Sequence, residues 1–207
     1  MRKIYWLFVA ILCVHSVYGQ GNKQITLEDI WKNGTFRVKD VPGFRAMKDG
    51  KHYTQLDRDG DSVRINVYDL ETGAKEKTIF TISCIAYAKK KNINIEDYTF
   101  SEDEKKMLLF ANGENVYRHS ANYYVFSYTI ETKVAEIVDV SKIMHATYSP
   151  DAKNVAFVLN NNLYYKELEK GNLVNVTTDG EKNKIINGNC DWVYEEEFSF
   201  TKAFQWS

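Results

Sequence analysis

The chain has 207 residues, a formal net charge of -1 and an aromatic content of 14%. This balance gives no reason to expect nucleic acid or an anionic membrane surface as a partner, because such partners select basic patches. The aromatic content favours strands over helices, and the presence of only 2 prolines excludes a long proline-rich linker.

Residues 1–19 are typical of a secretory signal peptide. Two basic residues come first, and the apolar stretch 4–14 that follows is too short to span a bilayer comfortably. We expect cleavage before Gln20 and export to the periplasm or the exterior. Residues 20–207 would then form the mature chain, with no membrane segment. An uncleaved N-terminal anchor is the alternative.

Residues 26–31 predict a short helix. Thr26 can cap its first turn, and Asp29 stands three residues later, where an acidic side chain can bond back to the cap.

Residues 57–61 place aspartates at the first, third and fifth positions of a calcium-loop pattern. Ser62 stands where such a loop needs glycine, and Tyr68 stands where it needs a glutamate. We therefore expect a β-turn and no metal site.

Two kinds of turn recur with a period of about 50 residues. The first kind covers 48–51, 101–105 and 149–153, and the second covers 70–73, 130–133 and 168–171. Between the turns lie strand-like runs such as 63–68, which alternates apolar and more polar residues, and 123–130, which is rich in aromatic and β-branched residues. This ordered recurrence predicts an all-β fold, namely a partial β-propeller. A β-sandwich would explain the short strands but not the two recurring turns.

The end of the sequence continues the repeat. Gln205-Trp206-Ser207 parallels 147–149, and the longer interval between them predicts an insertion at about 187–200, before a further blade.

Cys84 and Cys190 are the cysteines of the expected mature chain. They either form a disulfide or lie apart as small buried residues. Neither has a second cysteine or a histidine at metal-ligand spacing, so no zinc site is predicted.

Three consecutive glutamates at 195–197 are flanked by Trp192, Tyr194 and Phe198. The aromatic neighbours favour partial burial, where adjacent negative charges are tolerated best beside a cation. In a helical turn, two neighbouring carboxylates can converge on an alkylammonium and accept its three hydrogen bonds. A solvated acidic turn is the alternative.

The segment Asp-Trp-Val-Tyr-Glu-Glu-Glu at 191–197 resembles the glutamate motif of the dipeptidyl peptidase IV family, which are secreted serine peptidases of the prolyl-oligopeptidase type. Tyr-Arg-His-Ser at 117–120 is similar to the Arg-His-Ser segment of that family, and the segments 26–30 and 176–180 are also family-like. The resemblance covers about 20–207, essentially the whole expected mature chain.

The resemblance implies an eight-bladed propeller capped by an α/β-hydrolase domain, of which this chain would hold the first blades and not the catalytic domain. It implies that Glu196 and Glu197 bind the free α-ammonium of a peptide substrate. Arg118 would donate to the carbonyl between the first and second substrate residues. Glu195 would be structural.

The implied activity of the full-length enzyme is release of N-terminal Xaa-Pro or Xaa-Ala dipeptides from peptides with a free N-terminus, without a cofactor. No Gly-x-Ser-x-Gly nucleophile motif occurs in the sequence, and in the family the catalytic histidine belongs to the hydrolase domain. We therefore assign no catalytic residue here, His119 included, and expect the chain to be inactive alone. A homodimer of the full-length enzyme is an assembly that the resemblance allows. A non-catalytic secreted β-propeller that binds other proteins is the alternative function.

Overall fold

The computed structural model describes residues 24–38, 43–86 and 92–207, and the chain divides into two units, 1–41 and 42–207, which are described separately. The predicted signal peptide lies outside the described residues. Within those described ranges, no helix combines the length and the apolar character needed to cross a bilayer.

The first unit contains helix α2 (Leu27–Trp31), where the sequence predicts one. The hydroxyl of Thr26 accepts from the backbone N–H of Asp29 at 3.1 Å, and the Asp29 carboxylate accepts from the backbone N–H of Thr26 at 3.3 Å. This reciprocal pair is a capping box, which satisfies backbone donors that the helix cannot pair internally. The predicted helix is confirmed.

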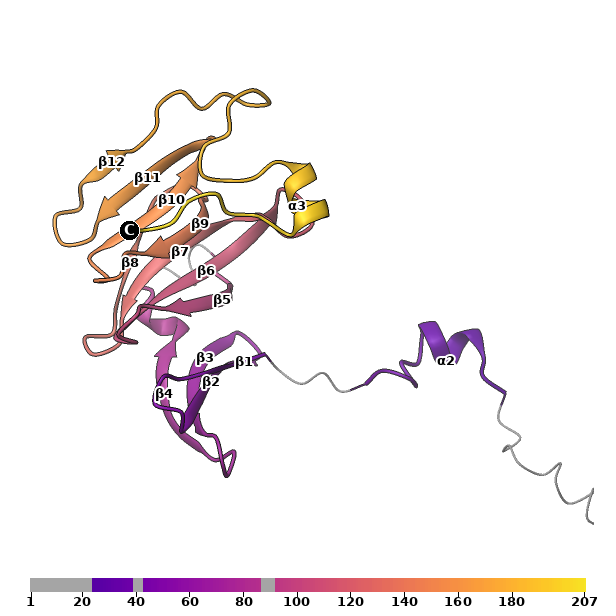
Figure 1. Ribbon diagram of the computed structural model, residues 1–207. Coiled ribbons are helices and arrows are strands. Elements are labelled where there is room, and N and C mark those ends of the chain that lie inside the picture. The colour runs from indigo at the N-terminus through magenta and orange to yellow at the C-terminus, as the bar shows by residue number, and fades with distance from the viewer. Residues whose placement is uncertain (1–23, 39–42, 87–91) are drawn as a thin grey trace, which may run out of the picture. The chain divides into compact units, whose positions relative to one another are not determined.

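The second unit contains three four-stranded antiparallel sheets, each built from strands in chain order (Figure 1). The first sheet consists of β1 (Phe44–Ala46), β2 (His52–Asp59), β3 (Ser62–Asp69) and β4 (Lys75–Thr81), followed by the 3₁₀ turn η2 (Ile82–Cys84). The second consists of β5 (Ile95–Phe100), β6 (Lys106–Asn115), β7 (Ala121–Thr129) and β8 (Val134–Ile137). The third consists of β9 (Met144–Tyr148), β10 (Asn154–Leu159), β11 (Asn162–Glu167) and β12 (Leu173–Asn175).

Each sheet is therefore one complete meander of four strands, which is the unit of a β-propeller blade. A β-sandwich would instead distribute neighbouring strands between two sheets. The predicted all-β fold, a partial propeller, is confirmed.

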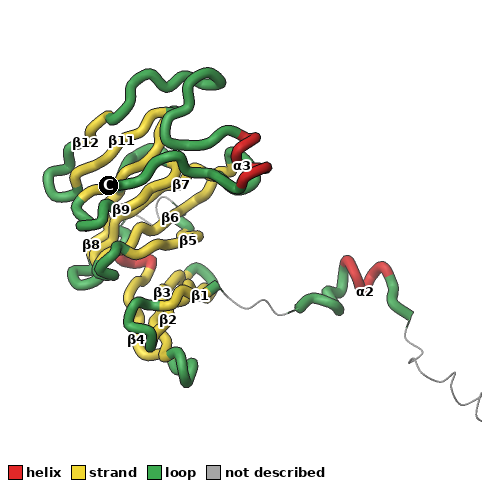
Figure 2. The backbone as a smooth tube through the Cα atoms, in the orientation of Figure 1, coloured by secondary structure: helices red, strands yellow, loops and turns green. Residues whose placement is uncertain are grey.

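Both predicted sets of turns connect strands, and each set has a fixed place in the blade (Figure 2). The first kind joins the first and second strands of every sheet, and the second kind joins the third and fourth strands. The repeat seen in the sequence is thus the repeat of the blades.

The first kind of turn is held by the same hydrogen bonds in the second and third sheets. Ser101 Oγ donates to Asp103 Oδ1, and Ser149 Oγ donates to Asp151 Oδ1, both at 2.7 Å. Each serine oxygen also accepts from the backbone N–H five residues later, at 3.0 and 2.9 Å. Both serines are buried. The recurring Ser-x-Asp pattern therefore satisfies the polar atoms of a buried turn.

Residues 57–61 form the hairpin between β2 and β3, with Gly60 at a φ of 56° in the turn. The Asp57 carboxylate accepts from the Tyr68 hydroxyl and the Asn66 amide, both at 2.5 Å, on the neighbouring strand. The expected β-turn is confirmed, and Asp57 serves the sheet.

Two hydrophobic clusters connect the sheets. One includes Phe80 from the first sheet and Tyr128 from the second, and the other includes Val125 from the second and Phe157 from the third. Fully burying a side chain of this size stabilises the fold by about 1.5–3 kcal/mol. The hydroxyl of Tyr128 donates to the carbonyl oxygen of Ile79 at 3.0 Å, so its polar tip is satisfied inside the core.

Strand direction alternates within every sheet, so the loop between the second and third strands lies at the same end as the chain that leaves the fourth. The β6–β7 loop, residues 116–120, connects the second and third strands of the second sheet. Residues 176–207 leave the third sheet and contain helix α3 (Trp192–Phe198), which Figure 1 shows beside the β6–β7 loop. The topology thus brings together the two segments that the sequence analysis selected.

Candidate functional site: the β6–β7 loop and helix α3

Helix α3 contains the three consecutive glutamates, as the helical interpretation predicted. Asp191 caps its start, because Asp191 Oδ1 accepts from the backbone N–H of Tyr194 at 3.0 Å. Ser199 ends it with a φ of 57°, in the left-handed region. Successive residues of a helix point about 100° apart, so the three glutamates project in different directions.

Arg118 and Glu196 form an ion pair that joins the two motifs. Arg118 Nη1 lies 3.1 Å from Glu196 Oε2, and the side chains are 70% and 16% exposed, respectively. The guanidinium therefore reaches from solvent to a carboxylate that is mostly shielded. Two of the three predicted substrate-binding residues are brought into contact.

Glu195 makes a second link between the same segments. Its side chain is buried, with 1% of the residue exposed. Its Oε1 accepts from the backbone N–H of His119 at 2.5 Å and from that of Ser120 at 3.2 Å. The second oxygen, Oε2, is also buried and has no hydrogen-bond partner within the described part of the chain. This agrees with the structural role expected of Glu195.

The charge of Glu195 is maintained by these bonds. Burial acts to raise its pKa, but the His119 amide, the Ser120 side chain and the Ser120 amide together outweigh that effect and leave the pKa below its ordinary value. At neutral pH the buried group is therefore a carboxylate, held by two backbone dipoles.

Glu197, the third predicted residue, lies on the exposed side of α3. Among the described residues it has no hydrogen bond or ion pair, so its carboxylate is available to a ligand. Glu196, Glu197 and Arg118 together carry one net negative charge, which a single ammonium group would neutralise.

The expected partial burial of the aromatic neighbours is wrong. Trp192, Tyr194 and Phe198 are each more than half exposed in the described structure. The reason is the orientation of α3, which turns Glu195 inward and leaves the apolar side chains on the outer face. The buried side chain of α3 is that of Glu195 and not that of an aromatic residue.

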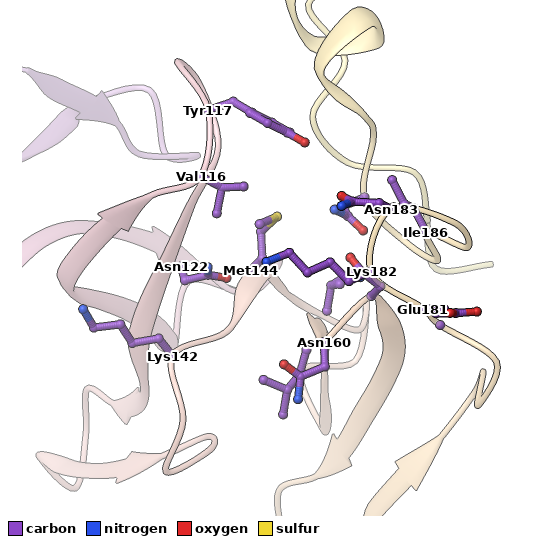
Figure 3. A pocket seen from close by; sticks show the side chains of 15 residues that line it. Val116, Tyr117, Asn122, Lys142, Met144, Asn160, Glu181, Lys182, Asn183 and Ile186 are labelled. Atoms are coloured by element: carbon purple, nitrogen blue, oxygen red, sulfur yellow. The ribbon is translucent and has the colours of Figure 1, made fainter.

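A hollow of about 630 Å³ adjoins the β6–β7 loop. Figure 3 shows Tyr117 and Lys182 pointing into it from opposite walls, with Met144 between them, while the Glu181 carboxylate points away. Asn160 and Asn183 add amide groups to the lining. Arg118, Glu196 and Glu197 are not among the residues that line this hollow.

His145 is a residue of this region that the sequence did not single out. It lies in β9 with a φ of 60°, and its Nε2 is buried without a hydrogen-bond partner in the described residues. Burial and the positive charge of Lys202 lower the pKa of His145 to about 4, against the opposing effects of the Thr201 backbone and Glu195. No spacing signal in the sequence marks this histidine.

The two cysteines left open by the sequence are both free thiols. Cys84 lies in η2, within hydrogen-bond range of the Tyr128 hydroxyl at 3.8 Å. Cys190 precedes the α3 cap, where burial and the neighbouring acidic groups Asp191 and Glu195 raise the pKa of its thiol. In the described structure they are therefore separate.

Known proteins are similar to this chain in sequence and in fold. Residues 101–207 match the family described as the dipeptidyl peptidase IV N-terminal region. The human protein named prolyl endopeptidase FAP is 31% identical over 195 residues, which are 93% of this chain and 24% of that protein. Dipeptidyl peptidase 4 of Felis catus is 32% identical over 185 residues, 88% of this chain and 23% of that protein.

The fold is similar to the crystal structure of Porphyromonas gingivalis dipeptidyl peptidase 4, with a TM-score of 0.79 and 36% identity. That match covers 91% of this chain and 26% of the other. The chain thus spans about a quarter of the length of the relatives it matches. With a matching family region, similar relatives and the same fold, the chain belongs to the dipeptidyl peptidase IV N-terminal-region family.

Proposed function

We propose that this chain is the N-terminal propeller portion of an exported dipeptidyl peptidase IV-like serine peptidase and that it supplies the site for the free amino terminus of the substrate. Glu196 and Glu197 bind the α-ammonium, and Arg118 donates to the first peptide carbonyl. The catalytic groups belong to another part of the full-length protein. Export rests on the signal-like residues 1–19.

The observation that carries this proposal is the ion pair between Arg118 and Glu196. Arg118 lies in a loop of the second sheet and Glu196 in the segment that follows the third sheet, yet their charged groups lie 3.1 Å apart. The N-terminal unit of a peptide presents an ammonium, which donates hydrogen bonds, and a carbonyl, which accepts them. The carboxylates of Glu196 and Glu197 suit the ammonium, and the guanidinium of Arg118 suits the carbonyl.

Substrate binding would bring the net charge of the three side chains and the ammonium to zero. The ammonium takes the acceptors of Glu196 and Glu197, and the exposed guanidinium of Arg118 turns to donate to the carbonyl oxygen. Fixing the amine also fixes the distance to the bond that is cut, because two extended residues span about 7 Å. Such positioning gives removal of two residues at a time.

The proposal is tested by the products that the full-length protein releases. A peptide that begins Xaa-Pro is incubated with it and followed by mass spectrometry. We expect the free Xaa-Pro dipeptide and a shortened peptide as the first products. Release of single amino acids would contradict the proposed removal of two residues at a time. A protein that binds the peptide and cuts nothing would support the non-catalytic binding module instead.

A further inference from the structure

We propose that Glu195 is a positioning residue of the amine site: it holds the β6–β7 loop so that Arg118 stands opposite Glu196. This inference rests on the proposed function and goes beyond the structural role that the sequence suggests. It makes all three consecutive glutamates parts of one device, two facing the substrate and one facing the protein.

The geometry is a two-point lock between short segments. Arg118 is paired with Glu196 through side chains, and the next two residues, His119 and Ser120, give their backbone N–H groups to Glu195. Three consecutive loop residues thus contact two consecutive helix residues. The contact at His119 joins positions 76 residues apart.

The loop itself has little else to fix its tip. It is closed by the backbone N–H groups of Val116 and Tyr117, which both donate to the carbonyl oxygen of Ser120, at 2.8 and 3.3 Å. These bonds close the loop on itself but do not connect it to α3. Tyr117, Arg118 and His119 are all exposed. The bonds to Glu195, together with the ion pair between Arg118 and Glu196, therefore tie the exposed tip to α3.

The burial of Glu195 has an unfavourable free energy. A buried carboxylate with an unpartnered oxygen, Oε2, costs free energy that an apolar residue of the same size would not. What the carboxylate provides is a charge-assisted acceptor for two adjacent amides, at 2.5 Å from the His119 nitrogen and 3.2 Å from the Ser120 nitrogen. An apolar residue at 195 would fill the same space and leave the buried amide of Ser120 and the partly buried amide of His119 without this acceptor.

The lock predicts a selective defect. With the tip released, the Arg118 guanidinium samples many positions, so substrates that depend on the amine site bind more weakly. A reaction at the catalytic serine that does not use the amine site should be unaffected. This separation distinguishes a positioning residue from one that merely maintains the fold.

The test uses the full-length enzyme with Glu195→Leu, which removes the acceptor, and Glu195→Gln, which keeps the shape and one acceptor oxygen. Glu131→Gln, in the exposed β7–β8 turn, is the matched control for loss of a glutamate charge. For each variant we measure KM and kcat with a free-amine Xaa-Pro substrate, the labelling rate of the active-site serine by a fluorophosphonate, and the melting temperature.

We expect Glu195→Leu to raise KM for the free-amine substrate by about tenfold or more, because the amides of His119 and Ser120 lose their acceptor and the loop loses its fixed position. Glu195→Gln should raise it less, and Glu131→Gln should leave it unchanged. The labelling rate should stay at the wild-type value in all three. If Glu195→Leu proves too unstable to assay, the KM and labelling of Glu195→Gln decide.

An unchanged KM in the folded Glu195 variants would overturn this inference. Equal losses of labelling and of free-amine cleavage would also overturn it, because they indicate a general structural effect. The proposed function fails separately, if Glu196→Gln and Glu197→Gln leave the KM of the free-amine substrate unchanged. If those two variants weaken binding and the Glu195 variants do not, only the positioning role is lost.

Discussion

The Arg118 side chain is long and exposed, so we expect its loss to affect substrate binding more than folding stability. An ion pair to a side chain that is 70% exposed contributes at most about 1 kcal/mol to folding, because solvent screens it. Its proposed contribution to binding is larger, because the planar guanidinium can direct its fixed N–H donors at the substrate carbonyl, whereas lysine offers a point charge.

We expect Arg118→Ala and Arg118→Lys to leave the melting temperature nearly unchanged. Both should raise KM for a free-amine dipeptidyl substrate, and the alanine variant should do so more strongly. Steady-state kinetics and thermal unfolding of the same preparations check this. A large fall in melting temperature with an unchanged KM would show that Arg118 serves the fold instead.

His145 gives the protein a pH dependence with a definite sign. Its pKa is lowered to about 4 in the folded state, chiefly by burial and then by Lys202, whereas an unfolded histidine titrates near its ordinary value of 6.5. Between these two values the unfolded chain binds more protons than the folded one, so stability falls as pH falls from about 6.5 to about 4.

This linkage is worth at most about 3 kcal/mol at the acidic end. We expect His145→Gln to reduce the slope of melting temperature against pH in that window, and to have little effect on the slope above pH 7. The nearby groups Glu195 and Lys202 are retained as they are. Equal slopes for the variant and the wild type between pH 4 and 6.5 would refute the assignment.

At the scale of elements, α3 is a helix that cannot be stable by itself. It has seven residues, and isolated helices shorter than about 12 residues are marginal in water. Glu196 and Glu197 also stand toward its C-terminal end, where the helix dipole disfavours negative charge. The Asp191 cap and the bonds to Glu195 therefore maintain it.

We expect Asp191→Ala to destabilise the protein by about 1 kcal/mol, because an N-cap side chain is lost. It should also raise KM for free-amine substrates, since Glu196 and Glu197 are carried by the loosened helix. Asp191→Asn retains a capping oxygen and serves as the control. Denaturant unfolding and kinetics measure both effects. Wild-type KM in a destabilised Asp191→Ala protein would show that the site does not depend on the cap.

The blades illustrate what local sequence can predict. The alternation in β3 and the Ser-x-Asp turns have short-range causes, namely the two-residue period of a strand and hydrogen bonds within five residues, so they are readable from the chain. The same holds for the α2 capping box.

The whole molecule shows what local sequence could not predict. The contact between the β6–β7 loop and α3 depends on how neighbouring blades stack. In the sequence, only the resemblance of both segments to motifs of one peptidase family indicated that they act together. The inward turn of Glu195 was unreadable for the same reason, because its partners are backbone amides, which have no sequence signature. His145 is buried by segments distant in sequence, including Thr201 and Lys202.

The central claim is that Glu196 and Glu197 recognise a charged amino terminus. Its most direct test compares kcat/KM of the full-length enzyme for an Xaa-Pro substrate and for the same substrate with an acetylated N-terminus, in the wild type and in Glu196→Gln and Glu197→Gln. Acetylation removes the ammonium charge, so we expect the wild type to prefer the free amine by at least about thirtyfold, as loss of an ionic partner at a shielded carboxylate such as Glu196 typically costs about 2–5 kcal/mol. Each variant should lose most of this preference. Equal cleavage of the two substrates by the wild type, or an undiminished preference in both variants, would contradict the account.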